Sequence, residues 1–172
     1  MKQNTDSTEK SIIIEMLKFT SFIKIVDIGA LMYDNISPNY QPLVDSNIAE
    51  VIGFEPNLDE QLKLKASLPN HTYLPYAIGD GTESMFYSTE MPSCSSLLKP
   101  NLDILGDFYH FPEWMKVKKE STIKTYRLDD VLKEQDIDFI KLDIQGSELT
   151  ALENGINTLN SSIIIELEVE FI

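Results

Sequence analysis

The sequence predicts an α/β fold with a doubly wound, mostly parallel sheet. Three continuous apolar runs of strand length end in the acidic residues Asp27, Glu55 and Asp143. Such runs are typical of parallel strands that are buried on both faces. Segments with helical periodicity lie between these runs, and strands that alternate with helices favour a parallel sheet covered on both sides.

The chain of 172 residues is long enough for one domain with a substantial core. We expect residues 1–21 to form an N-terminal tail that includes a short amphipathic helix over 11–20. Residues 22–172 are expected to form the α/β domain.

Apolar periodicity locates the elements in the first half of this domain. The expected strands cover 22–28, 50–55, 71–77 and 84–88, and the expected helices cover 43–49 and 58–68. Pro38 and Pro42 indicate a loop after the first strand. Asn57 is a helix-capping residue type, and Pro69 ends the helix that follows it.

Residues 90–120 interrupt the alternation with three prolines and a group of aromatic residues. We expect a long, partly helical excursion that either closes over a ligand as a lid or packs as a satellite core. The remaining strands are expected over 122–128, 137–143 and 162–168, with helices over 129–135 and 147–159. Sheets of this type usually continue further, so the chain is either a minimal version or a fragment that stops after the fifth core strand.

The composition excludes several classes of function. A formal net charge of −14 repels phosphate backbones and anionic lipids, so neither nucleic acid nor a membrane surface is an expected partner. One cysteine and two histidines support neither a disulfide framework nor a metal site built on those residues. Oxygen ligands from Asp143, Glu148 and Glu166 are conceivable, but their spacing does not require a metal, and none is expected. The absence of a signal-like or membrane-spanning apolar segment favours a cytoplasmic protein.

The acidic residues at the strand ends point to a nucleoside cofactor. The carboxyl ends of parallel strands share one edge of a sheet, and this edge is where open α/β sheets bind ligands. Glu55, held by Pro56, has a carboxylate that can accept two hydrogen bonds from a ribose diol. The segment from Asp27 to Ala30 is a strand-to-turn signal in which Gly29 allows close approach of a ligand. The alternatives are an ordinary turn and a solvated acid.

The turn after the first strand lacks the full glycine pattern of dinucleotide-binding proteins. Leu31 and Tyr33 lie where glycine or another small residue would normally follow. A tightly held pyrophosphate is therefore disfavoured, whereas a cofactor without phosphate, such as S-adenosylmethionine, is compatible with this turn.

Two further segments contribute candidate residues. Asp80 follows Ile78 and Gly79 at the expected position of an adenine, where it could accept from the exocyclic amine; the alternative is a β-turn made by Asp80 and Gly81. Asp143 ends a core strand, and Glu148 begins the next helix, where electrostatic capping is its competing role.

Six motifs follow one another along residues 22–172: Asp27-Ile28-Gly29-Ala30, Phe54-Glu55-Pro56, Ala77-Ile78-Gly79-Asp80, Ser95-Ser96-Leu97, Arg127-Leu128-Asp129-Asp130, and the run from Phe139 to Glu148. Their combined order resembles that of the FkbM-type methyltransferases. The resemblance implies a Rossmann-like fold of the class I methyltransferase type and S-adenosylmethionine as cofactor. It also implies O-methylation of a hydroxyl on a sugar or secondary metabolite, which is the expected small-molecule partner.

The resemblance also suggests roles for individual residues. The expected cofactor-binding set is Asp27, Gly29, Ala30, Glu55, Asn57, Ile78 and Asp80. Asp143 would lie beside the transferring methyl group and is the first candidate for the base or acceptor-positioning residue. His110 is the second, because it titrates near neutrality, although a histidine between two aromatic residues more often packs or faces solvent. Lys141 is expected to be structural and to pair with an acid.

Two other functions remain compatible with the sequence. One is a degenerate Rossmann-like module that binds a nucleoside or a partner without turnover. The other is an NAD-dependent oxidoreductase. The loop from Ser93 to Ser96 could contact a cofactor or an acceptor, or could be an ordinary polar loop.

Overall fold

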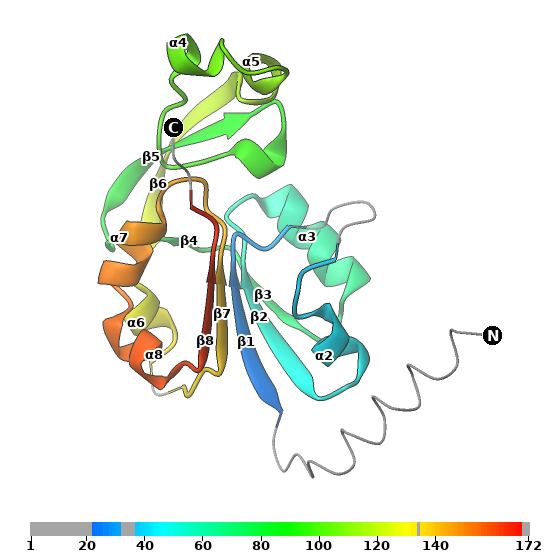
Figure 1. Ribbon diagram of the computed structural model, residues 1–172. Helices are drawn as coiled ribbons and strands as arrows, with labels where there is room; N and C mark the ends of the chain where they lie inside the picture. The colour runs from blue at the N-terminus through cyan, green and yellow to red at the C-terminus, as the bar shows by residue number, and fades with distance from the viewer. Residues whose placement is uncertain (1–21, 32–36, 134, 170–172) are drawn as a thin grey trace, which may run out of the picture.

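The computed structural model describes residues 22–31, 37–133 and 135–169, so the predictions for residues 1–21 and for Tyr33 lie outside the described residues. Five parallel strands form the central sheet in the order β3-β2-β1-β7-β8 (Figure 1). These strands are β1 (Ile23–Ile28), β2 (Ala49–Phe54), β3 (Thr72–Leu74), β7 (Phe139–Leu142) and β8 (Ile164–Leu167).

Helices cover the two faces of this sheet, which gives the molecule three layers (Figure 1). Helices α2 (Gln41–Asp45) and α3 (Leu58–Ser67) lie on one face. Helices α6 (Leu128–Val131), α7 (Glu148–Glu153) and α8 (Ile156–Ser161) lie on the other. The predicted α/β fold with a doubly wound parallel sheet is confirmed.

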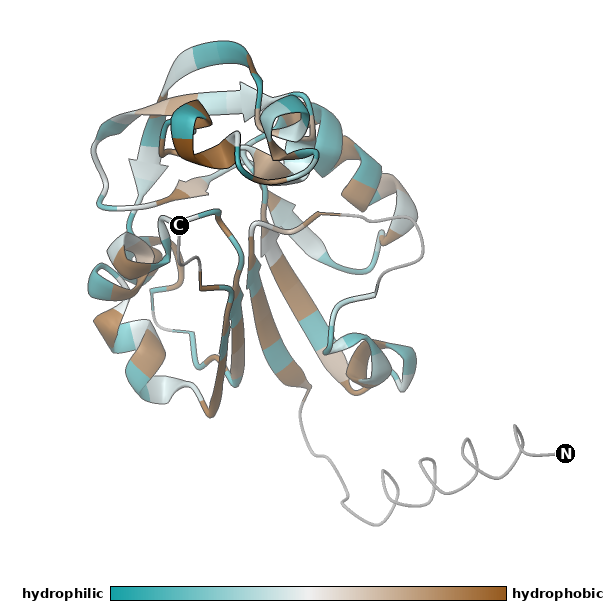
Figure 2. Cartoon of the chain, turned by 45° about the horizontal axis from the view of Figure 1, so that its top comes forward, coloured by the Kyte–Doolittle hydropathy of each residue, from teal (hydrophilic) through white to brown (hydrophobic). Residues whose placement is uncertain are grey.

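The central strands are apolar along their length because each strand packs on both of its faces. In β1, Val26 and Ile28 belong to the buried cluster that includes Leu128 and Ala151, whereas Ile25 belongs to a separate cluster with Tyr40. Figure 2 shows hydrophobic bands along the central strands. Alternate residues therefore serve opposite layers, which is the arrangement expected for a doubly covered parallel sheet.

A second, three-stranded sheet was not predicted. It has the order β4-β6-β5 and consists of β4 (Ala77–Ile78), β5 (Glu83–Thr89) and β6 (Val117–Tyr126). The expected single strand over 71–77 is split, because Pro75 has no N–H for the ladder, and β4 pairs with β6 instead. The strand expected over 122–128 begins earlier and pairs antiparallel with β5.

Residues 90–116 form the predicted excursion, with the short helices η1 (Pro92–Cys94), α4 (Leu102–Leu105) and α5 (Phe111–Trp114). Its aromatic rings contact one another: the ring centroids of Phe108 and Phe111 are 5.9 Å apart, and those of Phe111 and Trp114 are 5.8 Å apart. The rings form a surface aromatic cluster, in which Phe108 is 40% and Trp114 38% exposed.

Three helix boundaries differ from the prediction. The helix expected over 43–49 is α2, which begins earlier with Pro42 in its first turn and ends before β2 starts. Helix α6 is shorter than the expected 129–135. The helix expected over 147–159 is broken at Gly155 into α7 and α8.

The break at Gly155 has a packing cause. A Cβ at this position would lie 2.8 Å from Cδ2 of Leu128, so any other residue would require the Leu128 side chain to shift. Glycine has no side chain to cap α8, and Asp129 supplies the cap from another helix. Its carboxylate accepts from the backbone and side-chain groups of Asn157 and Thr158 at 2.9 to 3.2 Å.

Replacing Asp129 with alanine is expected to lower the free energy of unfolding by about 2 kcal/mol, as loss of a helix cap does. Burial raises the pKa of Asp129, but the hydrogen bonds from Thr158 and Asn157 outweigh it and lower the pKa. The stabilisation that ionised Asp129 gives the folded protein is therefore complete above the ordinary aspartate pKa. It is lost as the pH falls through the lowered pKa of Asp129. Urea denaturation followed by circular dichroism measures the effect.

Asp130→Ala is the matched control, because Asp130 is exposed and lies 3.8 Å from the Arg127 guanidinium. An exposed pair of this kind is worth less than about 0.5 kcal/mol. Equal destabilisation by the two substitutions would contradict the capping role of Asp129.

Strand β8 lies at the edge of the sheet and pairs with β7 alone among the described residues. Large apolar side chains are exposed along this edge: Ile163, Ile164, Ile165, Leu167 and Val169.

In the part of the chain that the structure describes, no helix has the length and apolar character needed to cross a membrane.

Candidate functional site

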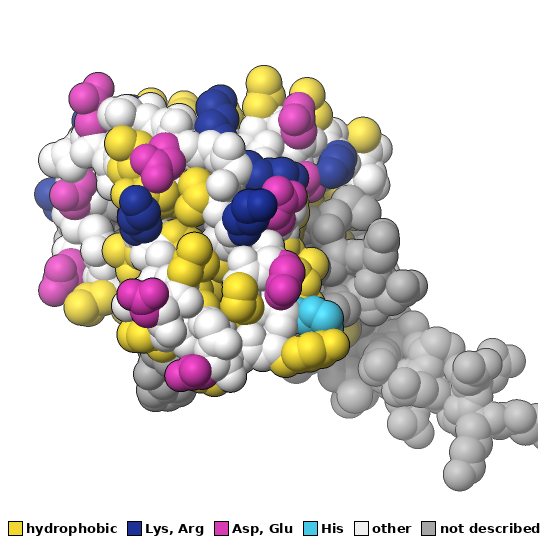
Figure 3. Space-filling model, turned by 90° about the horizontal axis from the view of Figure 1, so that it is seen from above, with side chains coloured by type: hydrophobic (Ala, Val, Ile, Leu, Met, Phe, Trp, Pro, Cys, Tyr) yellow, Lys and Arg dark blue, Asp and Glu magenta, His cyan; other side chains and the backbone are white. Residues whose placement is uncertain are grey.

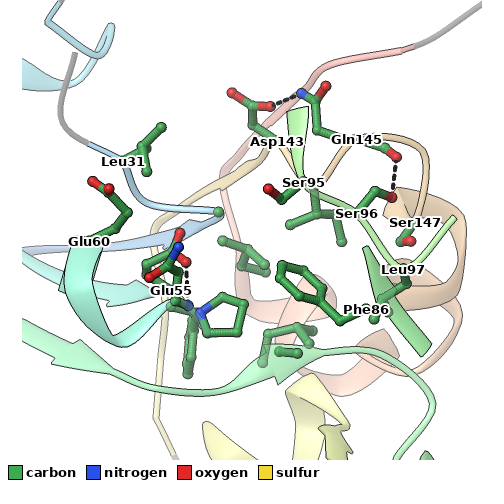
Figure 4. A pocket seen from close by; sticks show the side chains of 18 of the residues that line it. Leu31, Glu55, Glu60, Phe86, Ser95, Ser96, Leu97, Asp143, Gln145 and Ser147 are labelled. Atoms are coloured by element: carbon green, nitrogen blue, oxygen red, sulfur yellow. Dashed lines mark hydrogen bonds between the residues drawn. The ribbon is translucent and has the colours of Figure 1, made fainter. Parts of the chain in front are cut away.

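A pocket lies at the carboxyl ends of β1, β2 and β7, where the sequence places its acidic residues (Figure 4). Loop residues that follow β5 close its opposite wall. Five of the predicted site residues line it: Gly29, Glu55, Asn57, Ile78 and Asp143. We call this space the main pocket.

Glu55 is the buried carboxyl group of the main pocket. It is 7% exposed, and its Oε1 accepts a hydrogen bond from the backbone N–H of Asn57 at 2.6 Å. Burial raises the pKa of Glu55 to about 7, although the Asn57 hydrogen bond opposes the shift and the nearby charge of Glu60 adds to it. The group therefore gains or loses its proton near neutrality.

Asn57 combines a structural role with its place in the lining. Its side-chain Oδ1 accepts from the Asp59 N–H at 3.1 Å and caps α3. The capped turn fixes the backbone N–H that holds Glu55. The short path from β2 into α3 thus sets the orientation of the carboxyl group.

Gly29 forms the tight turn at the end of β1 with a φ of 83°. The N–H groups of Gly29 and Ala30 donate to the carbonyl oxygen of Phe54 at 3.0 and 3.1 Å. Ala30 packs with Leu64 and Tyr73 in a separate apolar cluster and does not belong to the main-pocket lining.

Asp27 does not line the main pocket either. Its carboxylate lies on the sheet face beneath α2, where it accepts from Tyr40 Oη at 2.6 Å and from Lys141 Nζ at 3.2 Å. Burial raises the pKa of Asp27, against the lowering effects of Lys141 and Tyr40. Asp27 lines a different hollow, which it shares with Ala30 and Tyr40.

Lys141 connects Asp27 with Asp143. Its Nζ lies 3.2 Å from an Asp27 oxygen and 3.4 Å from an Asp143 oxygen, which confirms the expected pairing with acidic residues. Burial lowers the pKa of Lys141, but the two carboxylates outweigh it and raise the pKa. The lysine therefore stays charged.

Asp143 lies at the upper rim of the main pocket in Figure 4, where Gln145 Nε2 donates to its Oδ1 at 2.8 Å. Burial raises the pKa of Asp143, but hydrogen bonding with Glu168 and the charge of Lys141 outweigh it, so the pKa lies below its ordinary value. Asp143 is thus ionised at neutral pH and can accept a hydrogen bond or a proton.

The structure places Asp80 and His110 outside the main-pocket lining. Asp80 is exposed and accepts from the N–H and hydroxyl of Thr82 at 2.9 and 2.7 Å, as a β-turn acid does. His110 is exposed with a φ of 69°, and its ring stacks on Trp114 at a centroid distance of 5.4 Å. Their predicted roles in cofactor binding and catalysis stay predictions.

Glu148 has a structural role. Its Oε1 accepts from the Ile144 N–H at 2.8 Å and closes the turn between β7 and α7. In the described ranges, no group of three or more His, Cys, Asp or Glu side chains is arranged to hold a metal ion, so Glu148 does not join Asp143 and Glu166 in such a site.

Several lining residues were missing from the predicted set: Phe86, Ser95, Ser96, Leu97 and Gln145. Ser95, Ser96 and Leu97 form one of the six motifs of the resemblance, and the loop of Ser95 and Ser96 is a predicted contact of a cofactor or an acceptor, but neither indication assigns these residues to the site. Phe86 lies in a strand whose alternation was visible, but the second sheet that directs it to the pocket was not. No local signal identified Gln145.

Comparison with known proteins gives one match. A family model described as the methyltransferase FkbM domain matches residues 27–172. No curated protein and no solved structure matches the chain.

Proposed function

Since the chain belongs to the family of FkbM-domain methyltransferases, we propose that it transfers a methyl group from S-adenosylmethionine to a hydroxyl oxygen of a small molecule. The observation that carries this proposal is the shared pocket of Glu55 and Asp143. We infer that Glu55 binds the cofactor and that Asp143 receives the acceptor's proton.

The residues of the main pocket fit this cofactor. An ionised Glu55 can accept hydrogen bonds from the two ribose hydroxyl groups. Ile78 and Phe86 offer apolar surface to the adenine. The turn at Gly29 gives the chain room for a polar tail without the glycine-rich cradle that a pyrophosphate needs. A cofactor without phosphate therefore suits this lining.

Bound S-adenosylmethionine supplies a methyl carbon activated by a positively charged sulfur. Displacement at that carbon would join it to the acceptor oxygen and would leave the electron pair of the broken carbon–sulfur bond on sulfur. Asp143 accepts the hydroxyl proton, which then passes to solvent. Alignment of the oxygen within the pocket provides a large part of the acceleration, and the positioned carboxylate provides the rest.

Isothermal titration calorimetry with Glu55→Gln tests the cofactor assignment. At pH 8, where Glu55 is ionised, the substitution is expected to weaken S-adenosylmethionine binding roughly 30-fold. Two hydrogen bonds to a charged group become bonds to a neutral one, which costs roughly 2 kcal/mol in total.

Glutamine preserves the shape of the side chain and removes a buried charge, so the variant should be no less stable than the wild-type protein. Denaturation curves verify this. Equal binding by the two proteins, or no binding by the wild-type chain, would refute the assignment. NAD titrated in parallel is expected to release no heat.

The raised pKa of Glu55 predicts pH-dependent cofactor binding. Because the ionised group binds the ribose, affinity should be constant above about pH 8 and fall tenfold per unit below the pKa of about 7. The unliganded protein behaves oppositely: it should lose stability as pH rises from about 4.5 to about 7, since the folded state holds the proton more tightly. Calorimetry and urea denaturation at several pH values measure the two effects. Glu55→Gln should abolish both.

A further inference from the structure

A second hollow adjoins the main pocket on the side of the excursion. It has a volume of about 140 Å³ and shares Ser96 and Gln145 with the main pocket. Its other walls come from residues 98–101, helix α4 and Met115. We call this space the side pocket.

Helix α4 forms one wall of the side pocket, and local interactions fix this helix. Asn101 Oδ1 accepts from the N–H groups of Asp103 and Ile104 and so caps α4. Leu105 is buried and packs this helix against the rest of the protein. The wall is therefore present before any ligand arrives.

The boundary between the two pockets is also fixed. Ser96 Oγ donates to the carbonyl oxygen of Gln145 at 2.7 Å and accepts from the Leu98 N–H at 2.9 Å. Gln145 has a φ of 56°, a conformation that few residues other than glycine adopt. In this conformation its side chain donates to Asp143, so Gln145 connects the Asp143 carboxylate with the boundary between the two pockets.

The side pocket is lined mainly by apolar side chains: Leu98, Pro100, Ile104, Leu105 and Met115. Its cation, Lys99, lies 3.6 Å from the Glu120 carboxylate and 5.9 Å from the centroid of the Tyr87 ring, so its charge is already compensated. Figure 3 looks down on this end of the molecule and shows hydrophobic side chains interspersed with charged ones. Such walls suit neither an anion nor a ring with many hydroxyl groups, which would lose hydrogen bonds to water.

The size of the hollow limits what can enter. An apolar cavity of about 150 Å³ in another protein takes up a benzene molecule. The side pocket, at about 140 Å³, is close to this size. A single six-membered ring therefore fits in this hollow, which is open to solvent beside Leu98 and Ile104.

We propose that the side pocket binds the apolar ring of the methyl acceptor and directs the ring's hydroxyl group toward Asp143. This inference rests on the proposed function and names its substrate class: a compact apolar ring that carries a hydroxyl group, as in a phenol, rather than a sugar. Gln145 is a positioning residue at the boundary of the two pockets, because its side chain holds the carboxylate that receives the proton.

A fluorine NMR titration of the full chain with 4-fluorophenol tests the proposal. Ile104→Asp places a charge on the wall of the side pocket and is expected to weaken phenol binding at least tenfold. Leu102→Asp is the matched control, because Leu102 lies on the same helix and outside the lining. The two side chains are 44% and 50% exposed, so the substitutions should leave the fold intact. The control should change the affinity less than twofold.

Calorimetry with S-adenosylmethionine separates this proposal from the proposed function. Both variants are expected to bind the cofactor as the wild-type protein does. Phenol binding that depends on Ile104 supports the side pocket even if the cofactor fails to bind, in which case the proposed function alone is refuted. No phenol binding, equal loss in the two variants, or preferential binding of methyl glucoside would overturn the assignment.

Discussion

Gly29→Ala is expected to destabilise the protein by about 3 kcal/mol. The φ of 83° alone costs an alanine about 1 to 2 kcal/mol. The added Cβ would also lie 1.9 Å from the carbonyl oxygen of Asp143, and this oxygen belongs to backbone that cannot move alone. The N–H of Asp143 donates to Ile28 at 3.0 Å, so relief of the clash separates β1 from the end of β7. Urea denaturation measures the loss.

Gly106→Ala is the control for this prediction. Gly106 ends α4 with a φ of −60°, which alanine adopts readily, and its nearest neighbour to an added Cβ is 3.3 Å away. Its substitution should change stability by less than about 1 kcal/mol.

The surviving folded fraction of Gly29→Ala should bind S-adenosylmethionine weakly, because the displaced turn lines the main pocket. Wild-type stability in Gly29→Ala would show that β1 and β7 do not meet as described.

Asp143→Asn is expected to reduce the rate of methyl transfer by roughly 10²- to 10⁴-fold, the usual contribution of a positioned base. Asparagine keeps the size of the side chain and still accepts from Gln145, but it cannot take a proton. Lys141 retains Asp27 as its partner, so no buried cation is left uncompensated. Single-turnover transfer from labelled S-adenosylmethionine to an acceptor that the wild-type protein methylates measures the rate.

Cofactor affinity should change less than about threefold in Asp143→Asn, because Asp143 acts on the acceptor. Asp80→Asn is the comparison variant, since Asp80 is an exposed turn residue outside the main pocket. It should affect neither binding nor transfer. A transfer rate in Asp143→Asn within fivefold of wild type would remove the carboxylate from the reaction.

The parallel sheet could be predicted from the sequence, because three of its strands are short apolar runs followed by acidic residues. The second sheet could not. Strand β4 is only Ala77–Ile78, and it leaves the main sheet through pairing with β6, a partner far along the chain. The break between α7 and α8 was also hidden, because the glycine there is needed by Leu128 in another helix. Contacts between distant segments decide these features, and local periodicity does not report them.

In the candidate site, too, some features follow from the local sequence pattern and others depend on contacts between distant segments. Glu55 and Asp143 meet because the ends of parallel strands share an edge, which the sequence pattern predicts. The orientation of Asp27 depends on which face of β1 its side chain occupies, and in the structure it shares that face with Ile25 and lies beneath α2. Gln145 and Phe86 reach the pocket through an unusual turn and an unpredicted sheet. His110 was proposed from its chemistry alone, and its position in a surface aromatic cluster depends on tertiary packing.

The position of Lys141 has a consequence for how the site responds to charge. A single ammonium group serves two carboxylates, so the ionisation states of Asp27 and Asp143 are thermodynamically linked. When one of them is neutralised, its repulsion of the other carboxylate disappears, and the pKa of the other falls. The buried Asp27 beneath α2 thus influences proton uptake at Asp143, because both carboxylates contact the same ammonium group.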